Sequence, residues 1–552
     1  MKKILCICLT FLLLVSSLCC LSGCQQLADA LFSGPGKGPL ASEYPANFVP
    51  KGKQSQTAYA DMVYVRPDLE ELEQLKAAVC EAAADGNAEI TMQCLNSYYY
   101  AYDWFFTNYY LADIHYCADL TDSYWEEEYA FCMENSAWLD AELEDLYYTL
   151  AASSVCEQLE NDYFGEGWFD GYTGENNWDK AFTALLEEEA VLQGRYYELS
   201  SIAADYTYGT EGFYEACGDE MVELLVELIG VRQRIAAYWG YPDYPTFATD
   251  FYYYRDYAPD QAEAYLADVR QELVPLYVRL NSDPKFQVDY DVSTEKETYA
   301  YVQSMAENMG GSVKLAFDRM DKFGLYDIGY GENKYNSSFE IYLTMYEAPF
   351  VFMDPTGTRY DQLTFAHEFG HFCNDFAARG SYAGIDVLEV FSQAMEYLSL
   401  CYAEGGSRLV KMKMWDSLCM MVEQSAFADF ENRMYALEGD ELNADNLRAL
   451  YDEVAREYGF ESVSYDDREF ITITHFYTNP MYVISYVVSN DSAMQFYQLE
   501  QEQSGAGLEV FEDNLKTESY YFLEFLEEAG LESPFVPGRV AALRETFETA
   551  LE

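Results

Sequence analysis

The chain has 552 residues, of which 50% are hydrophobic and 17% aromatic, so it can bury a large core and is not an intrinsically disordered protein. Its formal net charge is −64 at pH 7, from 96 acidic and 32 basic residues. A surface with this charge repels phosphate backbones, and we therefore expect no nucleic acid among its partners.

The N-terminus has the pattern of a secretory signal. Two lysines precede an apolar run over residues 4–21, and the tetrapeptide LSGC, which is similar to the bacterial lipoprotein signal, ends at Cys24. We predict that residues 1–23 are removed and that acyl chains on Cys24 anchor the protein to the bacterial cell membrane, outside the cytoplasm. An uncleaved transmembrane anchor is the alternative, although the run is marginal for spanning a bilayer. Residues 24–60, rich in glycine and proline, are predicted to form a flexible tether.

Residues 61–230 are predicted to form an N-terminal helical domain. Its long amphipathic segments, for example from Leu95 to Cys117 and from Trp125 to Leu159, carry tyrosine-rich faces. His115 lies in an aromatic stretch without a motif and is interpreted as structural. Of the 14 cysteines, nine remain beyond the signal and Cys24, and their pairing cannot be deduced from the sequence.

A second domain, residues 231–552, begins with further helices and then two short apolar segments rich in β-forming residues. The segments from Phe339 to Met345 and from Pro349 to Met353 are predicted to pair as antiparallel strands. A turn sequence follows them and ends at Gly357. The exposed edge of such a sheet is suited to binding a peptide backbone as an added strand.

The most informative motif is His-Glu-Phe-Gly-His, from His367 to His371, because the chain has only four histidines. On a helix, residues i and i+4 lie one turn apart on one face, so both imidazoles can reach one metal ion. Glu368 then lies beside a water on that ion, where a carboxylate acts as a general base. The alternative is a helix whose histidines and glutamate only make hydrogen bonds.

A catalytic zinc needs three protein ligands and one open position. The segment from Gly384 to Gly405 has apolar residues at helical spacing, and its polar residues Glu389, Gln393 and Glu396 share one face. We predict Glu389 as the third ligand. Gln393 and Glu396 are then placed to hydrogen-bond the ligands and orient them.

The residues around these motifs resemble the thimet oligopeptidase and oligoendopeptidase F family of zinc metallopeptidases. Three stretches carry the resemblance: Gly357 to His371, Leu388 to Gln393, and His475 to Tyr486.

Two positions depart from the family pattern. Asn374 stands where the family often has a further histidine. The gap from His371 to Glu389 is also shorter than usual, and Glu396 lies nearer the family's usual spacing. The choice between Glu389 and Glu396 therefore rests on the residues that follow Glu389, which match the family's third-ligand segment.

The resemblance also implies roles for residues near the C-terminus. His475, Tyr482 and Tyr486 match positions that stabilise the oxyanion of the tetrahedral intermediate, where donors besides the metal are needed. Helical spacing places Tyr482 and Tyr486 one turn apart, on the same side. Because the chain has 52 tyrosines, packing alone is the alternative for either one.

These features predict a mainly α protein with a small antiparallel sheet beside the HExxH helix, and the family resemblance implies two helical lobes that flank a deep substrate channel. Residues 231–552 would be the zinc peptidase catalytic domain. We expect a monomeric oligoendopeptidase that binds one Zn²⁺ and hydrolyses internal bonds of short unfolded peptides outside the cytoplasm. A non-catalytic peptide-binding lipoprotein and a zinc carboxypeptidase are the alternatives.

Overall fold

The computed structural model describes residues 56–172, 180–203, 211–462, 465–517 and 519–551. The predicted signal, Cys24 and most of the predicted tether lie outside these residues. Within the described part, no helix is long and apolar enough to cross a membrane. All nine cysteines in the same part are free thiols.

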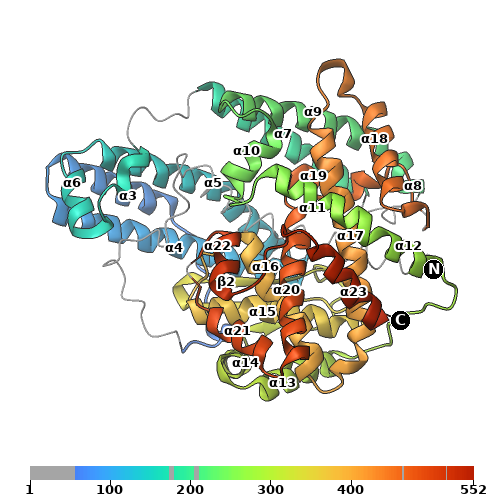
Figure 1. The fold of residues 1–552 in the computed structure, drawn as a ribbon. Helices are drawn as coiled ribbons and strands as arrows, with labels where there is room; N and C mark the ends of the chain where they lie inside the picture. The colour runs from blue at the N-terminus through green and yellow to red at the C-terminus, as the bar shows by residue number, and fades with distance from the viewer. Residues whose placement is uncertain (1–55, 173–179, 204–210, 463–464, 518, 552) are drawn as a thin grey trace.

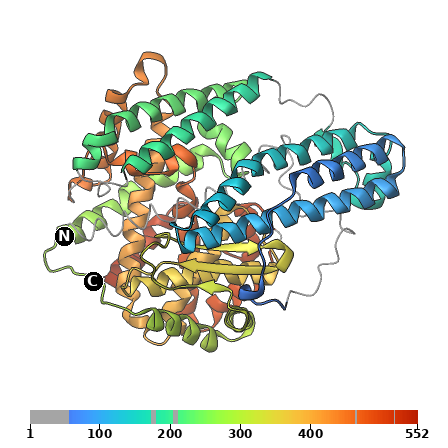
Figure 2. The same ribbon diagram turned by 180° about the vertical axis from the view of Figure 1, so that it is seen from behind.

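An N-terminal arm of packed helices projects from the side of the molecule (Figures 1 and 2). Asp68 starts the first helix by accepting hydrogen bonds from the backbone N–H groups of Glu70 and Glu71. The arm's helices are α3 (Leu69–Ala84), α4 (Ala88–Ala118), α5 (Ser123–Ala151) and α6 (Cys156–Leu159).

Two details of the arm bear on the sequence predictions. The helix predicted from Trp125 to Leu159 is interrupted, because α5 ends at Ala151 and the Ser153 hydroxyl bonds the carbonyl of Leu150 there. His115 stacks on Trp125, with ring centroids 4.1 Å apart, and thus lies within aromatic packing.

The remaining helices form two further groups, at the top and bottom of Figure 1. The upper group contains α7 (Lys180–Ala203), α8 (Glu211–Phe213), α9 (Asp219–Tyr238), α10 (Tyr244–Phe247), α18 (Ala444–Glu457) and α19 (His475–Thr478). The lower group contains α13 (Glu295–Met309), α14 (Gly311–Phe323), α15 (Tyr360–Ala378), α16 (Ile385–Tyr402), α20 (Ile484–Glu502), α21 (Ala506–Asn514) and α22 (Phe522–Ala529). Helix α17 (Val410–Met434) contacts α18 and α20 and so joins the two groups, together with α11 (Pro259–Glu272), α12 (Val274–Ser282) and α23 (Arg539–Leu551).

A three-stranded sheet lies against α15, in the order β1-β3-β2. Strands β2 (Ser338–Leu343) and β3 (Ala348–Met353) pair antiparallel as predicted, with Phe339 opposite Phe352. The short β1 (Tyr326–Asp327), which the sequence analysis did not anticipate, pairs parallel to β3, so the sheet is mixed. Every residue of the central strand β3 is buried, whereas the edge strand β2 is partly exposed.

The predicted mainly helical architecture is confirmed. Its centre is α16, which packs against α15 on one side and α20 on the other. Almost all of α16 between Asp386 and Leu400 is buried, so its polar residues lie inside the protein. The depth of a substrate channel stays a prediction.

Candidate active site

Helix α15 presents both histidines of the motif on one face. The helix begins where the Asp361 carboxylate accepts backbone hydrogen bonds from Thr356, Gly357 and Thr358, which fixes the turn before it. His367 follows six residues after Asp361, and its ring and that of His371 lie with their centroids 5.1 Å apart. The spacing of the motif therefore brings the two imidazoles together.

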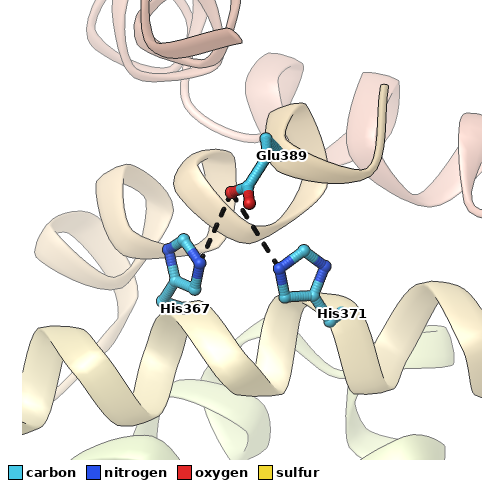
Figure 3. Close-up of side chains that lie close together, drawn as sticks. All are labelled: His367, His371 and Glu389. Atoms are coloured by element: carbon cyan, nitrogen blue, oxygen red, sulfur yellow. Dashed lines mark ion pairs between the residues drawn. The ribbon is translucent and has the colours of Figure 1, made fainter. Parts of the chain in front are cut away.

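Glu389 of α16 lies opposite both imidazoles (Figure 3). Its Oε2 is 3.5 Å from Nε2 of His367 and 4.0 Å from Nε2 of His371. One potential ligand atom from each of these three residues lies within 4.8 Å of the others. The Ser392 hydroxyl donates to the same carboxylate at 3.0 Å, which holds it in place.

Glu396 occupies a different place from Glu389. Its Oε1 is 2.9 Å from Nδ1 of His367, on the far side of the ring from Nε2. Its Oε2 pairs with Nζ of Lys413, also at 2.9 Å. Glu389 is thus the glutamate that reaches both imidazoles, and Glu396 orients one of them.

Close contact between α15 and α16 sets the distance between these groups. Gly370, inside the motif, lies so near α16 that a Cβ built on it would be 2.7 Å from the carbonyl oxygen of Phe391 and from Cα of Ser392. Real side chains do not approach this closely, so a glycine is required here.

The site is buried and dominated by carboxylates. Burial raises the pKa of Glu368 to about 7, and the neighbouring Glu389 and Glu396 contribute to the rise. Burial also raises the pKa of Glu389. For His367, burial lowers the pKa, but the Glu396 hydrogen bond and the nearby carboxylates outweigh it and raise the pKa to about 9.

Burial and the neighbouring His367 lower the pKa of His371 well below its ordinary value, so this imidazole is neutral at pH 7 and its ring nitrogen can bind a cation. Two imidazole nitrogens and a carboxylate oxygen are the ligand set of many catalytic zinc sites. The residues present therefore fit a divalent cation such as zinc.

His475, Tyr482 and Tyr486 gather at the same site. The ring of His475 stacks on Tyr482 with centroids 5.2 Å apart, and the Tyr486 hydroxyl is 3.5 Å from Nε2 of His475. The Tyr482 hydroxyl donates to Oε1 of Glu389 at 3.5 Å. Burial lowers the pKa of His475 to about 3, so its imidazole is neutral at pH 7.

Gln393 lies one turn from Glu389 and one turn from Glu396. Its side-chain oxygen accepts a 2.5 Å hydrogen bond from Asn490 of α20. It also hydrogen-bonds the Glu389 carboxylate. Asn374, the departure from the family pattern, is buried and donates to the carbonyl of Leu515.

The sequence analysis missed Lys413 and Arg255. Lys413 is 5% exposed and forms an ion pair with Glu396, which hydrogen-bonds His367. Arg255 bonds the segment that carries Tyr482, through the carbonyl of Met481. Neither residue belongs to a motif. The sequence indicates them only as basic residues within apolar segments of a chain that has few basic residues.

Two models of one protein family match the sequence and together span more than half of it. The Peptidase M3 N-terminal domain matches residues 59–173, and Peptidase family M3 matches residues 316–544, which include the HExxH helix and α16. This chain belongs to peptidase family M3. No curated protein matched it.

Solved structures share the fold of this M3 peptidase at low sequence identity. PZ peptidase A with an inhibitor has a TM-score of 0.74 and 20% identity, covering 89% of this chain and 98% of that one. A protein assigned as an oligoendopeptidase F from Bacillus anthracis strain Ames has a TM-score of 0.71 and 20% identity, over 90% and 98% of the two chains. Oligoendopeptidase F from Enterococcus faecium has a TM-score of 0.53 and 16% identity, over 87% and 96%.

Proposed function

We propose that this M3 peptidase is a zinc-dependent oligoendopeptidase that hydrolyses internal bonds of short, unfolded peptides. The observation that carries the proposal is the convergence of His367, His371 and Glu389, whose potential ligand atoms all lie within 4.8 Å of one another, next to Glu368. The names of the oligoendopeptidase F structures with the same fold support the substrate class.

His367, His371 and Glu389 would hold the zinc ion. When bound there, zinc would polarise the scissile carbonyl and make the attacking water more acidic. Glu396 keeps the His367 ring in the tautomer that directs Nε2 toward the ion, because it engages Nδ1.

Glu368 acts as the general base. Its carboxylate takes a proton from the water that attacks the carbonyl carbon, and later gives this proton to the leaving amine. With a pKa raised to about 7, it can do both near neutral pH. The hydroxyls of Tyr482 and Tyr486 and the neutral imidazole of His475 donate hydrogen bonds to the oxyanion.

Replacing Glu368 with glutamine tests this mechanism. E368Q removes the base and keeps the size of the side chain, so we expect a loss of turnover of about 1,000-fold or more, with zinc content unchanged. An internally quenched peptide blocked at both ends is the substrate. Unchanged hydrolysis by E368Q would reject the mechanism.

The same peptide separates the alternatives. An endopeptidase cleaves it internally, a zinc carboxypeptidase requires a free C-terminus, and a peptide-binding lipoprotein leaves it intact. Internal cleavage of the blocked peptide, identified by mass analysis, therefore identifies an endopeptidase. A second digest of the same peptide with a free C-terminus separates the two alternatives, because a carboxypeptidase shortens it and a binding protein does not.

We further propose that the protein is anchored outside the cytoplasm through acyl chains on Cys24. The support is the LSGC sequence after the basic and apolar start of the chain. The natural protein should partition into the detergent phase of a phase-separation assay, and C24A should not. Equal partition of both proteins would contradict the anchor.

A further inference from the structure

We infer that Arg255 is a positioning residue that fixes the segment from His475 to Tyr486 relative to α16, and hence the oxyanion donors relative to Glu389. This inference rests on the proposed function. It adds a residue that lies outside every motif.

Arg255 contacts both sides of the site through one guanidinium group. Nη1 donates to the carbonyl of Met481 and Nη2 to the hydroxyl of Ser485, each at 2.9 Å. Nε forms an ion pair at 3.4 Å with Asp386, in the first turn of α16. Tyr482 lies between the first two partners, and Glu389 lies one turn beyond the third.

Two tyrosines also contact Arg255 or its partner Asp386. The guanidinium carbon lies 4.3 Å from the ring centroid of Tyr253, and the hydroxyl of Tyr257 donates to the same Asp386 carboxylate at 3.0 Å. The side chain of Arg255 is 2% exposed. The buried Arg255 guanidinium is expected to keep these contacts, because the loss of a partner would leave its positive charge uncompensated inside the protein.

The segment that Arg255 holds has an unfavourable backbone. Met481 has φ +65°, a left-handed conformation that residues other than glycine rarely adopt. Two further hydrogen bonds stabilise this turn. The Glu431 carboxylate accepts one from the Met481 N–H at 2.7 Å, and the Tyr253 hydroxyl donates one to the Pro480 carbonyl at 2.9 Å. This strained turn sets the direction of Tyr482, and Arg255 connects the turn to the first turn of α16 through Asp386.

The chain contains a matched control for this arrangement. Arg539 has a side chain 5% exposed, pairs with Asp491 of α20, and shares that carboxylate with the hydroxyl of Tyr265. The three groups repeat the chemistry of Arg255, Asp386 and a tyrosine. Among the described residues, the side-chain hydrogen bonds of Arg539 and Tyr265 go to Asp491 and Gln498, outside the segment from His475 to Tyr486. Replacing Arg539 therefore tests the cost of losing a buried ion pair alone.

The experiment compares R255M, R255K and R539M as zinc-loaded full-length proteins. For R255M we expect kcat to fall about 100-fold, with KM within threefold and zinc content unchanged, because a misplaced donor weakens the transition state more than substrate binding. R255K should recover part of the kcat, and R539M should keep it within twofold. An internally quenched blocked peptide is the substrate.

Hydrogen exchange provides a readout that does not depend on turnover. Peptides covering residues 475–486 should exchange at least tenfold faster in R255M, while R539M leaves them unchanged. A wild-type protein that does not cleave peptides would refute the proposed function, and the exchange measurement would still decide whether Arg255 holds the segment.

Three results would overturn the inference. They are a wild-type kcat for folded R255M, a loss of kcat that follows loss of zinc, and an equal loss of kcat in R539M. If R255M does not fold, R255K and S485A, which removes one contact of Arg255, carry the test. Wild-type kcat in both would then overturn it.

Discussion

The pair of Glu396 and Lys413 offers a measurable test of how the protein tunes its proposed metal site. Glu396 accepts a hydrogen bond at 2.9 Å on each oxygen, from His367 and from Lys413. Burial opposes its charge, but Lys413 and His367 outweigh it and lower the pKa of Glu396. A charged Glu396 therefore faces His367 and makes Nε2 a stronger ligand.

Glu396→Gln keeps the shape and removes the charge. Loss of a partner of this kind weakens metal binding by 10- to 100-fold, about 1.4–2.7 kcal/mol, and we expect this decrease in zinc affinity. The variant also leaves Lys413, with a side chain 6% exposed, without a charged partner, at a cost in folding stability of about 3 kcal/mol.

Competition against a chromophoric chelator measures the zinc affinity, and chemical denaturation of the apoprotein measures the stability. The double variant E396Q/K413M separates the two effects, because it removes the buried charge and should regain stability without regaining zinc affinity. Glu500→Gln is the matched control, because Glu396 and Glu500 are both 7% exposed. Glu500 lies in α20 and accepts a hydrogen bond at 2.9 Å from the Tyr402 hydroxyl. A zinc affinity for E396Q within threefold of wild type, or an equal loss in E500Q, would refute the reasoning.

Three further changes probe the packing, the oxyanion donors and the buried acids. G370A should lower both the melting temperature and the zinc affinity, measured by calorimetry and chelator competition, because its Cβ forces α15 away from α16; unchanged affinity would contradict this. Y482F removes one donor, so kcat on the blocked peptide should fall about 100-fold with KM nearly constant, and an unchanged kcat would exclude Tyr482 from this role. Burial, with help from Glu469 and Asp416, raises the pKa of Glu423 to about 8 from an ordinary value of 4.5. The folded protein therefore binds the Glu423 proton more tightly than the unfolded chain does. The contribution of Glu423 to the free energy of unfolding is complete below pH 4.5 and is lost as pH rises through 8. E423Q should remove a few kcal/mol of this pH dependence, measured by denaturation at pH values between 5 and 9.

Helical periodicity predicted the active-site helices but could not choose between the glutamates of α16. Glu389 and Glu396 are seven residues apart and share a face, so both remained candidates. The choice depends on how α16 crosses α15, which the contact at Gly370 sets. The crossing angle between two helices depends on how they pack, and it cannot be deduced from the sequence of either helix alone.

Other features were missed because they depend on contacts distant in sequence. The strand β1 has two residues, too few for a period-2 pattern. Lys413 meets Glu396 across the turn between α16 and α17, and Arg255 meets Met481 from 226 residues away. The lipoprotein signal and the domain boundaries stay predictions.

The distribution of charge connects the composition with the site. Acidic residues outnumber basic ones by 96 to 32, and most acids are solvated, but several of the rare cations are buried where they hold the site together. Arg232, fully buried, bonds the carbonyl of Phe476, one residue after His475, as Arg255 bonds that of Met481. Lys413 instead pairs with the side-chain carboxylate of Glu396. A buried cation is costly unless it is paired, so each of these residues specifies one arrangement of its partners. In a chain with so few basic residues, a buried arginine or lysine therefore marks a fixed arrangement of its partners, and its contacts show whether that arrangement includes the site, as for Arg255, or lies elsewhere, as for Arg539.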